Sequence, residues 1–321
     1  MIAAKLASAV ARRRALGLPS AETNAYRLVH GDADGLSGVT VDVYDRHLVA
    51  SLYGEALDLP EAQLLEALAS LEYDGVYLKR RPRQANELDA QERKERAPEH
   101  AVIGNDAAPA IVVHESGVPI EVRLGDGLST GLFLDQRDNR ARVYAEARDA
   151  RVLNLFAYTC AFGLAAALGG ARETVNIDVS KPALERGRGN YARSGLVRES
   201  DKFLARDVLE ALPRLARRGE RFDLVILDPP SYASTKRGRF SVERDYPGLV
   251  TSALALVADG GSLLACTNHH KLTDAQLARA ITVAASASSR RIRTLEQLAP
   301  PADHPVLPGR APHLKSAWIR L

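Results

Sequence analysis

Cysteine is scarce in this chain, and its scarcity excludes a disulfide-stabilised fold. The 321 residues include two cysteines, Cys160 and Cys266. Two are too few for a disulfide framework, and neither is surrounded by residues at the spacing of a metal site. The sequence therefore predicts a protein of a reducing compartment, cytoplasmic in a bacterium, that binds no metal.

Long apolar runs are missing as well. No run approaches the roughly 20 consecutive apolar residues that a membrane-spanning helix needs. The first residues, Met1–Lys5, lead into an arginine-rich amphipathic stretch and not into the apolar core of a secretory signal. We therefore expect a soluble protein with no membrane partner, and the sequence leaves a homodimer open.

The chain also lacks an excess of one charge, because 43 lysines and arginines face 40 aspartates and glutamates, a net charge of +3. Basic residues nevertheless gather in three short runs, which can contact the phosphates of a nucleic acid even in a nearly neutral chain. Solvated surface is an equally good interpretation of each run taken alone. The runs are Ala11–Arg14, Leu78–Arg83 and Lys236–Arg239.

The first 128 residues have the pattern of a small α+β domain. With 46% hydrophobic residues, the chain is long enough for about two domains. We predict helices over residues 1–20 and 60–71, and an exposed loop over the charge-dense segment 84–99. Strands around one helix are typical of this fold class. The predicted extended segments are 26–29, 31–35, 39–44, 47–52, 75–78, 111–113 and 120–123.

From residue 129 to residue 321, strand patterns and helix patterns alternate. Repeated βα units predict a doubly wound parallel sheet with helices on both faces. The last two strands have no helix between them, so we expect them to pair as a hairpin. The predicted strands are 152–158, 174–178, 203–207, 222–227, 262–266, 291–295 and 316–321.

One of these strands leads into the most informative segment of the chain. The segment Phe222–Leu227 ends in the continuous apolar run Leu224–Leu227, typical of a strand that is buried on both faces. Asp228 follows it, and two prolines then fix the backbone so that the strand cannot continue. Ligands of open α/β sheets bind at this carboxyl edge. Asp228, Pro229 and the ring of Tyr232 are therefore a candidate platform for a planar nucleobase.

Two further strands end in an acid, Asp178 and Asp207, and a parallel sheet would place all three acids at one edge. Carboxylates there can accept hydrogen bonds from ribose hydroxyls and from an adenine amino group. Each acid alone is more often a helix cap or a turn residue. The turn over residues 156–163 has no Gly-x-Gly-x-x-Gly, which disfavours NAD and FAD, and the chain has no Walker loop. S-adenosylmethionine, which carries adenosine without phosphates, fits best.

Together these motifs resemble the class I S-adenosylmethionine-dependent methyltransferases of large-subunit ribosomal RNA. The resemblance implies a Rossmann-like, seven-stranded methyltransferase domain over residues 129–321, preceded by a small domain that faces RNA. Many such proteins carry a PUA domain before the small domain, and we expect no room for one here. The segments that carry the resemblance are Arg27–Gly31, Asp34–Gly38, Val41–Tyr44, Ser129–Arg140, Asn154–Thr159, Asp228–Tyr232 and Asp303–Val306.

The resemblance also assigns roles to individual residues. The segment Phe133–Arg140 would close over the cofactor, and the basic runs would hold RNA in place of a PUA domain. The implied cofactor contacts are Phe133, Gln136, Arg140, Asn154, Phe156, Tyr158, Thr159, Asp178, Val179, Asp207, Val208 and Asp228. The implied RNA contacts are Lys79, Arg80, Arg81, Lys236 and Arg237.

The segment around Cys266 bears on which atom is methylated. Cytosine carbon 5 becomes nucleophilic only after a thiolate adds to carbon 6. The cysteine position of the cytosine-C5 branch falls on Asn268 here, and Cys266 lies two residues earlier, about 6–7 Å along a strand. The guanine-N7 branch has an asparagine-rich segment at this point and a basic run like Ser234–Arg237. Guanine N7 carries its own lone pair and needs only orientation.

The sequence thus predicts an S-adenosylmethionine-dependent RNA base methyltransferase of 23S rRNA, with guanine N7 favoured over cytosine carbon 5. Asp228, Pro229, Tyr232 and Asn268 would hold the base. Cys266 is either a buried core thiol or, in the alternative, the nucleophile for cytosine. A small-molecule methyltransferase is a further alternative because fold alone fixes no substrate. A cofactor-binding RNA chaperone without catalysis is the third.

Overall fold

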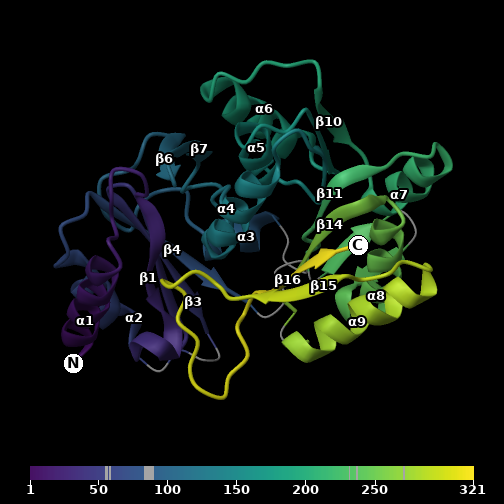
Figure 1. The fold of residues 1–321 in the computed structure, drawn as a ribbon. Helices are drawn as coiled ribbons and strands as arrows, with labels where there is room; N and C mark the ends of the chain where they lie inside the picture. The colour runs from purple at the N-terminus through teal and green to yellow at the C-terminus, as the bar shows by residue number, and fades with distance from the viewer. Residues whose placement is uncertain (55–56, 58, 83–89, 231, 236–237, 270–271) are drawn as a thin grey trace. The chain divides into compact units, whose positions relative to one another are not determined.

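The computed structural model describes residues 1–321 apart from 55–56, 58, 83–89, 231, 236–237 and 270–271. The described residues divide into two compact units, whose elements are labelled in Figure 1. The first unit comprises Met1–Asp135 and Pro301–Arg310, and the second comprises Gln136–Pro300 and Ala311–Leu321. The second unit therefore holds the alternating part of the chain, interrupted by a short segment that folds with the first.

A five-stranded sheet forms the centre of the first unit, in the order β1-β2-β3-β4-β5. Strands β1 to β3 are an antiparallel meander, and β4 pairs in parallel with β3 after helix α2. Apolar side chains of α1 and α2 share one core with this sheet. The elements are α1 (Ile2–Ala15), β1 (Ala25–His30), η1 (Gly31–Asp34), β2 (Val39–Tyr44), β3 (His47–Tyr53), α2 (Glu61–Ala69), β4 (Gly75–Arg81), α3 (Ala90–Arg96), β5 (Ile103–Gly104) and the hairpin β6 (Ile111–Glu115) and β7 (Val118–Val122).

Two local predictions for this unit are wrong. Residues 31–35 are not extended, because η1 is a short 3-10 helix in which the Asp34 carboxylate accepts the His30 N–H at 2.6 Å. The chain then turns at Gly35, whose φ of +73° suits glycine. The predicted loop over 84–99 contains helix α3, where the exposed side chains of Gln91 and Glu95 form a hydrogen bond one turn apart.

The second unit is a mixed seven-stranded sheet in the order β10-β9-β8-β11-β14-β16-β15. The first five strands in this order are parallel, and β15 and β16 pair as the predicted antiparallel hairpin. The elements are η3 (Leu134–Gln136), which leads into the unit, α4 (Arg137–Glu146), β8 (Arg151–Leu155), α5 (Ala161–Leu168), β9 (Glu173–Asp178), α6 (Lys181–Arg193), β10 (Asp201–Ala205), α7 (Val208–Arg217), β11 (Phe222–Leu227), β12 (Tyr232–Thr235), β13 (Gly238–Ser241), α8 (Val242–Leu254), β14 (Val257–Thr267), α9 (Asp274–Ala287), β15 (Thr294–Leu298) and β16 (Lys315–Arg320).

Successive side chains of the central strands point to opposite faces of the sheet, so the interior of this unit consists of two layers. On β11, Val225 and Leu227 point into a core with α7, α8 and α9, whereas Leu224 and Ile226 point into a second core with α4 and α5. Successive residues of a strand face opposite sides of a sheet, so both faces of β11 need apolar residues. This burial explains the continuous apolar run that the sequence shows before Asp228.

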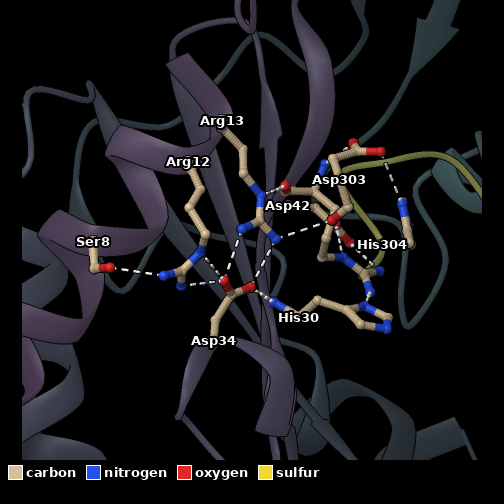
Figure 2. A network of polar contacts seen from close by, with 9 residues as sticks. Ser8, Arg12, Arg13, His30, Asp34, Asp42, Asp303 and His304 are labelled. Carbon is tan, nitrogen blue, oxygen red and sulfur yellow. Dashed lines mark hydrogen bonds and ion pairs between the residues drawn. The ribbon is translucent and has the colours of Figure 1, made fainter. Parts of the chain in front are cut away.

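The segment Pro301–Arg310 is anchored in the first unit by buried polar groups (Figure 2). Asp303 is fully buried, and its Oδ2 accepts the backbone N–H of Arg27 at 2.9 Å. Its carbonyl oxygen accepts a hydrogen bond from Nη2 of Arg13 at 3.0 Å, and the ring of His304 contacts its other carboxylate oxygen at 3.1 Å. These contacts make the segment an integral part of the first unit, although most of the chain around it belongs to the second.

Candidate active site

The carboxyl edge of the second unit's sheet carries the three acids that the sequence singled out. Strand β9 ends at Asp178, Asp207 follows β10, and Asp228 follows β11. The strands are parallel and lie in the order β10-β9-β8-β11. The three acids therefore lie along one edge, with the loop that follows β8 between Asp178 and Asp228.

The loop after β8 has a strained backbone. Phe156, Tyr158 and Cys160 adopt φ angles of +58°, +48° and +60°, in the left-handed region that residues other than glycine rarely enter. Each such residue costs on the order of 1–3 kcal/mol and persists only where its surroundings hold it. The Asp178 carboxylate supplies part of that support, since its Oδ2 accepts the N–H of Tyr158 at 2.8 Å. Strain of this kind is characteristic of ligand sites.

Asp178 and Asp207 are both engaged with backbone groups. Asp178 also accepts the N–H of Ser180 at 2.8 Å through its Oδ1. Each carboxylate oxygen has two lone pairs, so Asp178 keeps capacity for further donors. Asp207 caps helix α7 by accepting the N–H of Leu209 at 2.8 Å. A helix cap is the more common role of a single aspartate at the start of a helix. Val179, the residue after Asp178, is 70% exposed.

Three predicted cofactor residues have side chains that are buried by the protein itself. The amide of Asn154 is 1% exposed and donates to Oδ1 of Asn176 at 2.9 Å. Thr159 and Val208 are each 1% exposed, and Val208 belongs to the core beside α8. The cofactor contacts expected from these three residues stay a prediction, since the burial of a side chain leaves contacts through the backbone open.

Asp228 is held by a buried amide at the start of α4. Nε2 of Gln136 donates to Oδ2 of Asp228 at 2.8 Å, and Gln136 is 2% exposed. Oε1 of Gln136 accepts in turn from Nδ2 of Asn139 at 2.5 Å. Asn139 was not predicted as a site residue. Its spacing of three residues from Gln136 at a helix start was a signal that both side chains lie on one face.

Comparisons with known proteins show to which family the chain belongs. A profile for S-adenosylmethionine-dependent methyltransferases matches residues 27–319. The chain belongs to this family. It is 33% identical over 295 residues to ribosomal RNA large subunit methyltransferase I of Tolumonas auensis, covering 91% of this chain and 73% of the relative. It is 34% identical over 322 residues to a ribosomal RNA large subunit methyltransferase of Deinococcus radiodurans, covering 99% and 78%.

A solved structure resembles the whole fold of this methyltransferase. The crystal structure of SMU.776, "a putative methyltransferase complexed with SAH", superposes with a TM-score of 0.88 at 28% identity, covering all of this chain and 81% of the other. The Rossmann-like methyltransferase fold and the use of S-adenosylmethionine are thereby established for this chain. The resemblance found in the sequence is confirmed.

The described residues at the edge of the sheet suit S-adenosylmethionine. Asp178 has acceptor capacity for hydroxyl donors, and the exposed side chain of Val179 offers an apolar surface beside it. The strained loop from Phe156 to Tyr158 presents its backbone at the adjacent strand end. When bound, this cofactor supplies an electrophilic methyl group on a sulfonium.

Cys266 and Asn268 differ in their exposure. Cys266 lies in β14 with 0% exposure, and it packs in the core with Leu264 and Trp318. Its carbonyl oxygen accepts the hydroxyl of the buried Tyr246 at 2.9 Å. Asn268 follows the end of β14 and is partly exposed. Because Ala265 pairs with Leu227 at the end of β11, the chain after β14 leaves the sheet at the same edge as Asp228.

The remaining predicted site residues fall in several places. Phe133 belongs to the first unit and is 51% exposed. Arg140 is buried in α4, with its guanidinium 5.7 Å from the ring centre of Phe162. Pro229 is buried. The side chain of Tyr232 lies outside the described part of the structure, although its backbone begins β12.

One of the predicted RNA contacts is wrong. Lys79 is fully buried, and its Nζ donates to the carbonyl oxygen of Leu124 at 2.6 Å, so it does not face a phosphate. Burial lowers the pKa of Lys79 to about 8. Arg80 pairs with Glu61, and Arg81 donates to the carbonyl oxygen of Leu128, but both side chains are partly exposed. The predicted contacts at 236 and 237, Lys236 and Arg237, lie outside the described residues.

Among the residues that the structure describes, no three histidine, cysteine, aspartate or glutamate side chains are grouped so that they could hold a metal ion. Within the same residues, no helix combines the length and the apolar character needed to cross a bilayer.

Proposed function

We propose that this methyltransferase modifies a base of large-subunit ribosomal RNA and that the accepting atom is guanine N7. The relatives from Tolumonas auensis and Deinococcus radiodurans, which carry the ribosomal RNA name, align with nearly the whole chain and support this substrate class. The choice of atom rests on one observation, the complete burial of Cys266 in the core of the second unit.

The burial of the Cys266 thiol favours guanine N7 because only the methylation of cytosine carbon 5 needs a thiolate. Methylation of cytosine carbon 5 needs a thiolate that reaches carbon 6 and forms a covalent adduct. The Cys266 side chain is fully buried between apolar core residues and the Gln136 and Asn139 amides, where a thiol behaves as a small core group. Guanine N7 has an available lone pair, so the protein has only to orient the base for in-line transfer.

In this proposal, each group of residues at the sheet edge and in the basic runs has its own role. Asp178 and Asp207 accept hydrogen bonds from the adenosine part of the cofactor, and the backbone of Phe156–Thr159 lines the site. Asp228 and Asn268 hold the edge of the target base, with Tyr232 stacked against it. Arg80, Arg81, Lys236 and Arg237 contact RNA phosphates. The target base has to leave its stack first, which costs a few kcal/mol.

Replacing Cys266 with alanine is expected to leave the rate of methyl transfer within about threefold of wild type, because the thiol takes no part in the reaction. The loss of a buried sulfur should lower the free energy of unfolding by about 1 kcal/mol. Rates are measured with radiolabelled S-adenosylmethionine and rRNA from a strain that lacks the gene. Mass spectrometric mapping of the methylated nucleotide then identifies the base. A covalent adduct with 5-fluorocytosine RNA that disappears in Cys266→Ala would overturn the guanine assignment.

Changing Asp178 to asparagine is expected to raise the Kd for S-adenosylmethionine by roughly 10- to 100-fold. The new amide N–H2 would face the backbone N–H of either Tyr158 or Ser180, so it would disturb the strained loop and remove an acceptor at once. Isothermal titration calorimetry measures the effect. Asp259→Asn is the matched control, because Asp259 is 98% exposed near the start of β14, away from the carboxyl edge. Equal Kd values for the two variants would refute the role of Asp178.

A further inference from the structure

A chain of three polar side chains connects the interior of the second unit to Asp228. Gln136 and Asn139 are 2% and 4% exposed, and Ser316 on β16 is 2% exposed. Nδ2 of Asn139 donates to Oε1 of Gln136 at 2.5 Å and to Oγ of Ser316 at 2.8 Å. Nε2 of Gln136 donates to Oδ2 of Asp228 at 2.8 Å. The connection therefore runs from β16 through α4 to the acid that follows β11.

The chemistry of these groups determines which way each amide faces. An ionised carboxylate only accepts hydrogen bonds, so Gln136 must present its N–H2 to Asp228. Its carbonyl oxygen then faces the protein interior and requires a donor. Asn139 supplies that donor, and both hydrogens of its own N–H2 are used, one toward Gln136 and one toward Ser316. The thiol of Cys266 lies 3.8 Å from the same Gln136 oxygen, a weak contact that adds to the support.

We propose that Asn139 is a positioning residue for the methyl transfer, which acts by locking the Gln136 amide so that its N–H2 holds Asp228 in the orientation needed for the target base. This inference rests on the proposed role of Asp228. A carboxylate next to two prolines has a nearly fixed backbone, so its side-chain rotation is the freedom that remains. A fixed hydrogen bond removes that freedom before the base arrives, which is how a site is preorganised.

The first test compares Asn139→Asp with Asn139→Ala in the full-length chain. The aspartate offers oxygens where Asn139 offers hydrogens, so the Gln136 amide has to turn and present its carbonyl to Asp228. We expect kcat at pH 8 to fall by roughly 10- to 100-fold in Asn139→Asp, the size of effect that misalignment of a reacting group produces. The assay uses radiolabelled S-adenosylmethionine with naked rRNA or large subunits, whichever the wild-type chain methylates.

Lowering the pH separates a positioning role from a structural one. The carboxyl group introduced by Asn139→Asp becomes a donor again when it is protonated, and burial raises the pKa of such a group. Its kcat relative to wild type is therefore expected to recover as the pH falls from about 8 to about 5.5. Asn139→Ala has no proton to gain and should show no recovery. Asn105→Asp, the same change at an exposed position of the first unit, should follow the wild type throughout.

Two measurements without turnover complete the experiment. The calorimetric Kd for S-adenosylmethionine should stay within about threefold of wild type in both Asn139 variants. The melting temperature should fall in both, because each change leaves buried partners without their hydrogen bonds. Loss of cofactor binding in parallel with rate, without recovery of the rate at low pH, would overturn the inference in favour of a structural role. Wild-type rates in both variants, while Asp228→Ala is inactive, would also overturn it and leave the proposed function standing. An active Asp228→Ala would instead contradict the proposed role of Asp228 itself.

Discussion

Asp228→Ala is expected to reduce methyl transfer by on the order of 10²–10³-fold, because it removes a preorganised polar group from the site of reaction. Asp228 leaves β11 at the carboxyl edge of the sheet, and Pro229 and Pro230 restrict the backbone directly after it. Its Oδ2 is held by the buried Gln136. In its proposed role this side chain orients the bound base, and alanine has no group that could accept a hydrogen bond from Gln136 or from the base.

The measurement is a single-turnover assay with saturating S-adenosylmethionine, which reports the chemical step and not product release. Asp228→Asn serves as the conservative variant, since it retains the shape and one oxygen that can accept from Gln136 but replaces the other acceptor oxygen with a donor. Asp259→Asn controls for the loss of one negative charge elsewhere on the same unit. An Asp228→Ala variant with a wild-type single-turnover rate would remove Asp228 from the mechanism.

Asp34→Ala is expected to lower the free energy of unfolding of the first unit by about 3–5 kcal/mol, because it leaves a buried cation without its partner. Asp34 is 4% exposed and receives two hydrogen bonds from Arg13, each of 2.7 Å, while Arg13 is itself 2% exposed (Figure 2). Arg12 and the His30 N–H also donate to this carboxylate. Arg13 contacts Asp303 as well, so its displacement should loosen the segment Pro301–Arg310.

Chemical denaturation monitored by circular dichroism tests this prediction. The matched control is Asp74→Ala, which removes a carboxylate from an exposed pair with Arg46, and its unfolding midpoint should stay close to wild type. Equal midpoints for Asp34→Ala and Asp74→Ala would show that the buried network contributes little to folding.

The same network predicts how stability depends on pH. Burial by itself raises the pKa of Asp34, but hydrogen bonds from Arg13, Arg12 and the His30 N–H outweigh it, and the pKa is lowered from its ordinary value of 3.8. A group whose pKa is lowered by folding stabilises the native state fully above its unfolded pKa and loses that contribution as the pH falls through its folded pKa. Wild-type stability should therefore decline below about pH 4, and Asp34→Ala should show a flatter profile in that range.

The sequence predicted the second unit better than the first, for a physical reason. A stretch of strand that is buried on both faces is apolar, as Leu224–Leu227 of β11 is, and such runs alternate with helices in parallel sheets. The convergence of Asp178, Asp207 and Asp228 followed from the same rule, because parallel strands end at one edge. The small unit has short, partly polar segments, in which η1 and α3 carry no equally strong signal.

Burial was the property that the sequence predicted least well at individual residues. Lys79 lies in a basic run that is typical of exposed surface, yet both faces of β4 are covered there. The ammonium group of Lys79 donates to the carbonyl oxygen of Leu124. Asn154 matches a family motif, yet its amide is used inside the sheet by Asn176. A linear pattern gives the chemistry of a side chain but not the neighbour that will satisfy it.

The sequence by itself determined that this chain is a methyltransferase, because apolar periodicity, the Asp-Pro-Pro segment and the family motifs are all local properties of the chain. Only the tertiary structure decided which residues reach the site. It joined Gln136 and Asn139 to Asp228 across 92 and 89 positions of sequence, buried Cys266, and returned Pro301–Arg310 to the first unit. These outcomes depend on packing between distant segments, where each buried polar group must find a partner, and no local pattern encodes that choice.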